Sequence, residues 1–366
     1  MKKAYRIISV FLLMSLAVIL NIDNKNASAA TKAKVFINHT YSTDALYDLE
    51  VIRWFYKQLE ARTNGRYTAE HYYSEALAKA ADQVKAASGG IIDSFFNSLG
   101  YNPSEFVLNR VFEHVGITGS FDVQAKAIMD LYENEPLIRQ EWDRQNLVLI
   151  CPTLQTEMVI LSKKPIEKIE DLKGVKLRGY AQSGKALQML GSEIITIAAP
   201  ERYDALSKGV VDGISGIALD VAYAERLWEA APFISDIGLG VYSFTYFAMN
   251  KKVFESLPED DQRLIKKLGL EMIDKMVDDF PKMHERMIAD MVKKGVKIYE
   301  FTPSEKEKVI KTVTPAVWQA WVEETNKLKL PGQKILDEYV AAVKKYEKDD
   351  RYITPSKTYK RVSGSN

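Results

Sequence analysis

The sequence predicts a two-lobed α/β protein in which each lobe is a mostly parallel sheet flanked by helices. Three observations lead to this prediction. Strand-like and helix-like hydrophobic patterns alternate along the chain in two separate series. The 366-residue chain is 46% hydrophobic, which is more apolar material than one core usually holds. An extended segment at 240–249 follows the second series and is placed to return to the first lobe.

The first 29 residues are typical of a secretory signal peptide. Lys2, Lys3 and Arg6 precede an unbroken apolar run at 7–20, and small residues at 27–29 supply a cleavage site. The alternative, an uncleaved membrane anchor, is disfavoured because the run is shorter than the roughly 20 residues that span a bilayer. We therefore expect a periplasmic protein that does not span the membrane after signal cleavage.

Charge and cysteine usage narrow the classes of partner. The signal segment carries four positive charges and one negative charge, so its removal takes the formal net charge from +1 to about −2. A chain without a basic excess is poorly suited to nucleic acid or to an anionic membrane. The single cysteine, Cys151, excludes an internal disulfide and lies in an apolar strand, where a small buried side chain is favoured over a reactive thiol.

The first series of elements predicts lobe 1, assigned to residues 31–150 together with the returning segment at about 240–255. Gly65 stands just past the first helical period, where a helix end favours glycine. The expected strands lie at 34–38, 67–72 and 91–96, and the expected helices at 45–63 and 76–88.

The second series begins near Leu147 and predicts lobe 2, assigned to residues 151–239. Its strands are expected at 148–151, 158–162, 175–178, 193–197 and 213–217. Its helices are expected at 184–190 and 202–207. The strand at 240–249 then crosses back, so that the chain passes between the lobes twice.

A long helix and a helical pair are predicted at 258–345. Pro258 and the three acidic residues after it suit a first helical turn, because proline needs no hydrogen-bond donor there and acids favour the helix dipole. Apolar residues recur every three or four positions past Pro281 as far as Met291, which predicts one long or gently kinked helix with its methionines in the core. Helices at 303–325 and 333–346 follow. We expect the charged tail, 346–366, to be poorly ordered.

Signatures of catalysis and of metal binding are largely missing. The four histidines lie far apart and none has HExxH spacing. No G-x-S-x-G nucleophile motif occurs. The segment 179–186 matches the G-x-x-x-x-G-K of a phosphate-binding loop, but Ala186 replaces the hydroxyl residue that holds magnesium. We expect no enzyme activity, no metal and no cofactor.

Three motifs occur in order at 168–178 (KIEDLKGVKLR), 201–213 (ERYDALSKGVVDG) and 257–262 (LPEDDQ). With these motifs the chain resembles the DctP-type solute-binding proteins of tripartite ATP-independent periplasmic (TRAP) transporters, over roughly residues 34–330. The resemblance implies a periplasmic-binding-protein-like fold whose two lobes are braced by the long helix. It also implies a receptor that closes on one small organic acid and delivers it to the small and large permease subunits for uptake driven by an ion gradient.

The resemblance makes Arg178 the ligand anchor, since the arginine that ends the G-x-K-[IL]-R strand binds the substrate carboxylate in this family. A planar guanidinium can grip a carboxylate through two parallel hydrogen bonds. The alternative is a structural ion pair between Arg178 and Asp204 or Asp212. Further ligand contacts are expected from strand ends and from the crossing segment, at His39, Asn97, Ser98, Glu157, Tyr180, Gly216, Asp220, Tyr242 and Tyr246.

Two departures from the sialic-acid-binding members narrow the ligand. Those members carry a second arginine where this chain has 156–159, and an asparagine where it has Ser215 and Gly216. We therefore expect Arg178 to work without a second arginine, on a monocarboxylate with an apolar or aromatic body. The alternative ligand is an amino-bearing or zwitterionic acid whose cation pairs with Glu157 or Asp220. Two other functions stay open, a binding protein for an ABC importer or a sensor kinase, and a secreted α/β enzyme.

Overall fold

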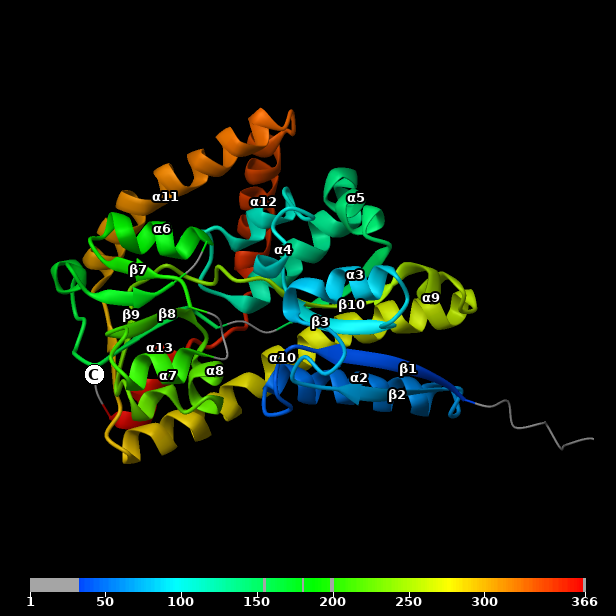
Figure 1. Cartoon of the computed structure of the whole chain (residues 1–366), viewed down its shortest axis with the longest axis horizontal. Helices are drawn as coiled ribbons and strands as arrows, with labels where there is room; N and C mark the ends of the chain where they lie inside the picture. Colours follow the sequence, from blue (N-terminus) through cyan, green and yellow to red (C-terminus); the bar gives the residue numbers. More distant parts are fainter. Residues whose placement is uncertain (1–32, 154–155, 180, 198–200, 365–366) are drawn as a thin grey trace, which may run out of the picture.

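A computed structural model describes residues 33–153, 156–179, 181–197 and 201–364 and shows two lobes, each built on its own sheet (Figure 1). In the described residues of each sheet, one strand runs against all the others. These two strands are β10 (Thr245–Asn250) in the first sheet and β5 (Val159–Ser162) in the second. The predicted two-lobed α/β fold is confirmed.

The first sheet has the strand order β2-β1-β3-β10-β4. Its strands are β1 (Lys34–Thr40), β2 (Tyr67–Tyr72), β3 (Ser94–Ser98), β4 (Leu147–Pro152) and β10 (Thr245–Asn250). The strand at 148–151, expected in the second lobe, is β4 and pairs with β10 in the first sheet. All six residues of β4 are buried, and a strand that is apolar on both faces carries no sequence signal for the sheet it joins.

The helices of the first lobe include three that the sequence did not predict. The helices are α2 (Tyr47–Arg62), α3 (Gln83–Ser88), α4 (Phe121–Asn134), α5 (Pro136–Arg144), α9 (Lys251–Glu255) and α12 (Gly332–Tyr346). Of these, α4, α5 and the short α9 had no predicted counterpart. Helix α4 buries Asp122 and Gln124, whose side chains bond to Lys126 and to the Phe112 carbonyl. Buried polar residues of this kind interrupt the apolar period from which a helix is recognised.

The second sheet has the strand order β11-β9-β5-β8-β6-β7. Its strands are β5 (Val159–Ser162), β6 (Lys176–Arg178), β7 (Glu193–Ile195), β8 (Gly213–Ile217), β9 (Phe233–Asp236) and β11 (Lys297–Glu300). The helices around it are α6 (Ala181–Met189), α7 (Arg202–Ser207), α8 (Leu219–Ala224) and α11 (Pro303–Lys327). The sequence did not predict β9 and β11, which are four residues each and pair in parallel with each other.

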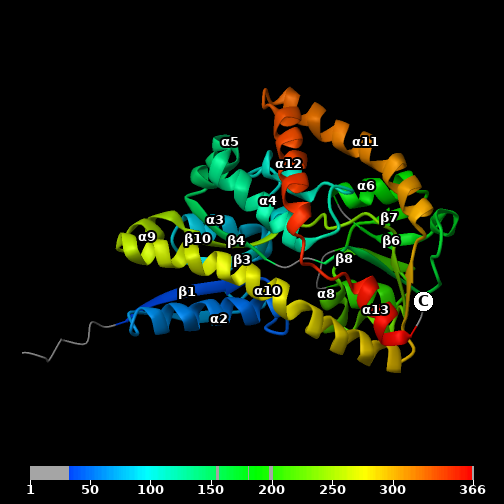
Figure 2. The same ribbon diagram turned by 180° about the vertical axis from the view of Figure 1, so that it is seen from behind.

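The long helix α10 (Glu259–Lys293) runs along both lobes, as Figures 1 and 2 show. Its first half packs Ile265, Leu268 and Met272 into the first-lobe core, whereas Ile288 and Met291 lie in the second-lobe core. Gly269 permits the closest approach, because a Cβ at this position would stand 2.4 Å from the Ile150 carbonyl oxygen. One rigid element therefore spans both lobes, as predicted.

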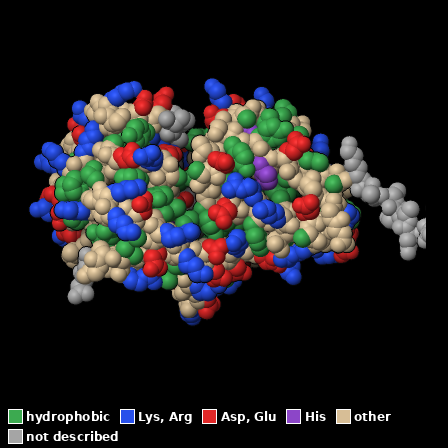
Figure 3. Space-filling model, turned by 90° about the horizontal axis from the view of Figure 1, so that it is seen from below, with side chains coloured by type: hydrophobic (Ala, Val, Ile, Leu, Met, Phe, Trp, Pro, Cys, Tyr) green, Lys and Arg blue, Asp and Glu red, His purple; other side chains and the backbone are tan. Residues whose placement is uncertain are grey.

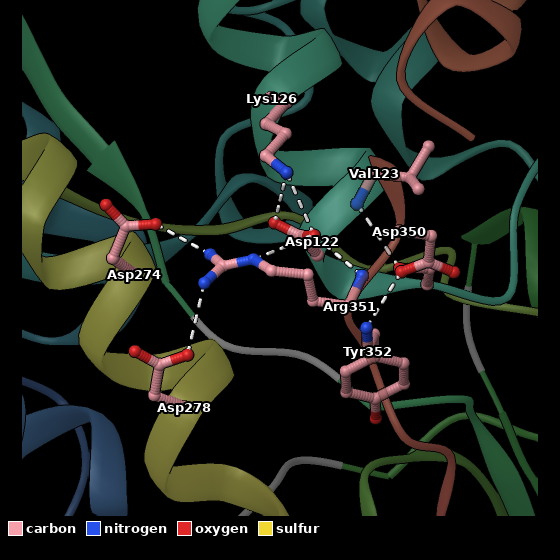
Figure 4. Close-up of polar contacts among 9 residues, drawn as sticks. Asp122, Val123, Lys126, Asp274, Asp278, Asp350, Arg351 and Tyr352 are labelled. Carbon is pink, nitrogen blue, oxygen red and sulfur yellow. Dashed lines mark hydrogen bonds and ion pairs between the residues drawn. The ribbon is translucent and has the colours of Figure 1, made fainter. Parts of the chain in front are cut away.

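The expectation that the tail is poorly ordered is wrong. After α12 the chain passes over α10 and ends in α13 (Pro355–Ser363), which packs beside α10 and β11 (Figure 2). Arg351 bridges Asp274 at 2.6 Å and Asp278 at 3.1 Å, and its backbone N–H donates to Asp122 at 3.1 Å (Figure 4). The segment is held by contacts between residues far apart in sequence, among them Tyr352 against Phe280, so its charged composition alone did not reveal its order.

The described part of the chain contains no membrane-crossing helix. The face drawn in Figure 3 has no area of uniform charge. No helix in this part of the chain is both long and apolar enough to cross a membrane. On that face, basic and acidic side chains are interspersed. A surface of mixed charge gives a polyanion no extended basic area to bind.

Candidate ligand-binding site

A cavity of about 70 Å³ lies between the two lobes. The first lobe lines it with residues that follow or end β1 and β3, with the start of α2 and with the start of β10. The second lobe lines it from the ends of β6 and β8 and from α7 and α8. The carboxyl ends of parallel strands from both sheets thus meet at one place, which is where open α/β sheets bind ligands.

Aromatic rings form the first-lobe wall of this cavity. Tyr41 stacks on Phe96 with ring centroids 5.5 Å apart, and its edge meets Tyr101 at 5.1 Å. Burial raises the pKa of the Tyr101 hydroxyl, so the ring stays neutral. Leu46 from the first lobe and Met158, which precedes β5 of the second, add apolar surface to the lining. This wall is suited to the flat or apolar body of a small molecule.

Arg178 stands on the opposite, second-lobe wall, at the last position of β6. The residue is only 5% exposed, and its Nε donates to the Ile197 carbonyl at 3.0 Å. Its own carbonyl oxygen accepts a hydrogen bond from Ser215 Oγ at 2.7 Å. The Ile197 carbonyl therefore orients the buried guanidinium, and a guanidinium is a group that can form charge-assisted hydrogen bonds with an anion.

A second arginine lines the same cavity, which the sequence analysis did not anticipate. Arg202, the first residue of α7, forms an ion pair with Glu225, and the two side chains are 11% and 34% exposed. Burial raises the pKa of Glu225, while Arg202 and then Arg178 act to lower it. Arg202 lies within the motif at 201–213, but nothing marked it as a cavity residue, because an arginine in a first helical turn normally faces water and its partner lies 23 residues away.

The family model for bacterial extracellular solute-binding proteins, family 7 (DctP), matches residues 37–324. This chain belongs to that family. The predicted resemblance to TRAP solute-binding proteins is confirmed. The family and the fold are those of transport binding proteins.

Two curated relatives of this family-7 protein have names that refer to solute binding or transport. A solute-binding protein of Verminephrobacter eiseniae is 28% identical over 239 residues, 65% of this chain and 70% of the relative. The outer membrane transporter protein TsaT of Comamonas testosteroni is 21% identical over 321 residues, 86% of this chain and 93% of the relative.

Two solved structures are similar in fold. A TRAP solute-binding protein of Rhodoferax ferrireducens, in complex with copurified benzoate, matches with a TM-score of 0.76 and 23% identity over 87% of this chain and 99% of its own. A marine metagenome TRAP solute-binding protein specific for aromatic acids, in complex with metahydroxyphenylacetate, matches with a TM-score of 0.77 and 20% identity. The match covers 86% of this chain and 99% of that protein's chain. At these identities the likeness establishes the fold.

Three of the predicted site residues, Arg178, Ser98 and Gly216, line the cavity of this family-7 protein. Gly216 has φ +64°, and a Cβ there would stand 3.3 Å from Ser183 Oγ and 3.7 Å from Tyr242 Oη. The Tyr242 hydroxyl therefore lies directly behind the glycine. Tyr180 lies outside the described residues.

The structure gives two other predicted contacts internal partners. His39 is fully buried and its Nε2 accepts the backbone N–H groups of Leu77 and Ala78 at 3.0 and 3.3 Å. Burial lowers the pKa of His39 to about 4, so it acts as a neutral acceptor. Asn97 donates to the Ala80 carbonyl at 3.0 Å. Both side chains hold the segment 77–80, which lies outside the cavity lining, instead of forming the wall.

The remaining predicted contacts, Glu157, Asp220 and Tyr246, also lie off the cavity lining. Tyr246 is fully buried, with its ring 4.9 Å from that of Trp142. Burial raises the pKa of Glu157 to about 8 and that of Asp220 to about 6. The acids that do line the cavity are Asp48 and Glu225. Among the described residues, no group of three or more His, Cys, Asp or Glu side chains could hold a metal ion.

Proposed function

We propose that this family-7 protein is the extracytoplasmic receptor of a TRAP transporter and that it captures a small aromatic or apolar monocarboxylate. The main support for this proposal is that Arg178 lies on one wall of the interlobe cavity. The rings of Tyr41, Phe96 and Tyr101 lie on the other wall. A ligand with one carboxylate and a flat body would satisfy both walls at once. Benzoate and metahydroxyphenylacetate in the two similar structures support this class.

Binding would combine two physical effects. The Arg178 guanidinium would form charge-assisted hydrogen bonds with the carboxylate, and closure of the lobes would exclude water and strengthen that attraction. The aromatic wall would bury the body of the ligand at about 25 cal/mol per Å² of apolar surface. The small cavity would exclude solutes much larger than one ring.

The rest of the function follows from the family. The signal peptide at 1–29 would be removed on export, leaving a periplasmic receptor with lobe 1 at 31–150 and about 240–255 and lobe 2 at 151–239. The protein would carry out no chemistry. It would hand its ligand to the small and large permease subunits, and an ion gradient across the membrane would drive uptake.

Thermal-shift measurements on the purified mature chain test the ligand class. Benzoate, 3-hydroxybenzoate and phenylacetate are compared with acetate, glucuronate, sialic acid and an amino acid of similar size. A ligand at 100 times its Kd adds about 2.7 kcal/mol to the free energy of unfolding, enough for a clear shift. We expect the aromatic acids to give the largest shifts. No shift with any carboxylate would refute anion capture, and a shift with the amino acid alone would favour the zwitterion and a role for Asp48.

Uptake assays test the transporter class. With the permease subunits in the same vesicles, uptake should stop when ionophores collapse the ion gradient and should persist without ATP. Uptake that needs ATP and survives the ionophores would assign the receptor to an ABC importer.

A further inference from the structure

The Arg202–Glu225 ion pair brings opposite charges to one wall of the ligand cavity. Arg202 comes from the first turn of α7 and Glu225 directly follows α8, so two separate elements hold the pair. Both side chains line the same cavity as Arg178. The ion pair is partly buried, with the guanidinium more enclosed than the carboxylate. A pair held in this way presents a hydrogen-bond donor and an acceptor side by side.

The charges of this wall act on one shared region. Both Arg202 and Arg178 stabilise the ionised form of Glu225, and both also act on the Tyr101 hydroxyl, as does Glu225. Arg178, Arg202, Glu225 and Tyr101 all line the same cavity. Glu225 forms its ion pair with Arg202 and so offsets the charge of that arginine.

The charges of Arg178, Arg202 and Glu225 limit how many negative charges a bound ligand can carry. A first carboxylate placed at Arg178 meets a cation. A second carboxylate at the third position of the same ring would meet Arg202 together with Glu225, and the like charge of Glu225 would weaken its binding. A hydroxyl group in that place can donate to Glu225 and accept from Arg202, at no charge cost.

We propose that Glu225, held by Arg202, is a specificity residue that restricts the site to ligands with one carboxylate and favours a hydroxyl group at the third position of the ring. The ligand class is thus the hydroxy-substituted aromatic monocarboxylates. This inference rests on the proposed function, since it assumes that Arg178 receives the carboxylate.

Titration calorimetry with three matched ligands tests the inference. Benzoate, 3-hydroxybenzoate and isophthalate share one ring and differ only in the group at the third position, which is hydrogen, hydroxyl or carboxylate. For the wild-type protein we expect 3-hydroxybenzoate to bind about tenfold more tightly than benzoate. We expect isophthalate to bind most weakly. This ranking needs no variant and is measured first.

The variant Glu225→Gln then removes the negative charge and keeps the shape. It should raise the affinity for isophthalate relative to benzoate on the order of tenfold or more, because Arg202 loses its counter-charge. Adding Arg202→Gln to this variant should abolish that gain. The matched control is Glu229→Gln, four residues away, whose carboxylate pairs with Arg226 outside the cavity lining. It should leave all three affinities unchanged.

The outcomes separate the two proposals. If the wild-type protein binds benzoate but binds isophthalate as tightly as 3-hydroxybenzoate, the inference is wrong and the proposed function stands. The same holds if Glu225→Gln keeps the wild-type melting temperature and the wild-type ratio of isophthalate to benzoate affinity. If the wild-type protein binds none of the three ligands, the proposed function fails and the inference fails with it.

Discussion

The C-terminal segment should stabilise the protein through one buried side chain, and the substitution Tyr352→Ala measures that contribution. Tyr352 is 5% exposed, and its ring lies 5.9 Å from that of Phe280 on α10. Truncation of a buried aromatic side chain to alanine typically costs about 3–5 kcal/mol. The neighbouring ion pairs of Arg351 are solvent-exposed and contribute little by comparison. The ring of Tyr352 is therefore the main anchor of the segment that ends in α13.

The matched control is Tyr352→Phe, which keeps the ring and removes a hydroxyl whose hydrogen bond to Glu157 is long, at 3.4 Å. We expect this variant to lose about 1 kcal/mol or less. At roughly 2 °C per kcal/mol, Tyr352→Ala should lower the melting temperature by about 6–10 °C. Trypsin should also cleave the alanine variant early, at the basic residues of α13. If both variants melt within about 2 °C of the wild-type protein, Tyr352 does not anchor the segment.

Three further predictions follow from other parts of the structure. Gly269→Ala should destabilise the protein by about 1–3 kcal/mol in thermal unfolding, because the new Cβ would stand 2.4 Å from the Ile150 carbonyl oxygen. This loss is expected although alanine favours helices. An unchanged melting temperature would contradict the close contact. Burial raises the pKa of Glu157 from 4.5 to about 8. Between these two pH values, the folded protein therefore keeps a proton that the unfolded chain has lost. The contribution of Glu157 to the free energy of unfolding is complete below pH 4.5 and is lost as the pH rises to 8. Glu157→Gln should flatten this decline and stabilise the protein on the order of 3 kcal/mol at pH 8, and equal slopes for both proteins in melting curves from pH 5 to 8.5 would count against it. Tyr41→Ala should weaken benzoate binding about tenfold in titration calorimetry and leave acetate binding unaffected, whereas equal losses for both ligands would show that the ring does not contact the ligand body.

The sequence predicted those parts of the fold whose signals are local. The long helix carries acids in its first turn and an unbroken apolar period, so its bounds and its core methionines were visible before the structure. Arg178 was found because it ends a strand within a motif, and the cavity lies at the ends of such strands.

The parts that were missed depend on contacts between distant residues. The strands β9 and β11 are too short to show a period, and each gains its place from the other. Arg202 belongs to the cavity because Glu225 holds it there, and the tail is ordered because Arg351 and Tyr352 find partners on α10. His39 lies near the end of its strand, as predicted, but its ring nitrogen accepts hydrogen bonds from the backbone N–H groups of Leu77 and Ala78. No pattern along the chain encodes these pairings.

The most direct test of the central claim is titration calorimetry of the Arg178→Lys variant with benzoate and 3-hydroxybenzoate. Lysine keeps the positive charge but loses the planar fork and the Nε bond that orients it at 3.0 Å from the Ile197 carbonyl. The account predicts a melting temperature close to that of the wild-type protein and a loss of binding of about 2 kcal/mol or more, roughly thirtyfold in Kd. Affinities equal to those of the wild-type protein would remove Arg178 from the site and contradict the account.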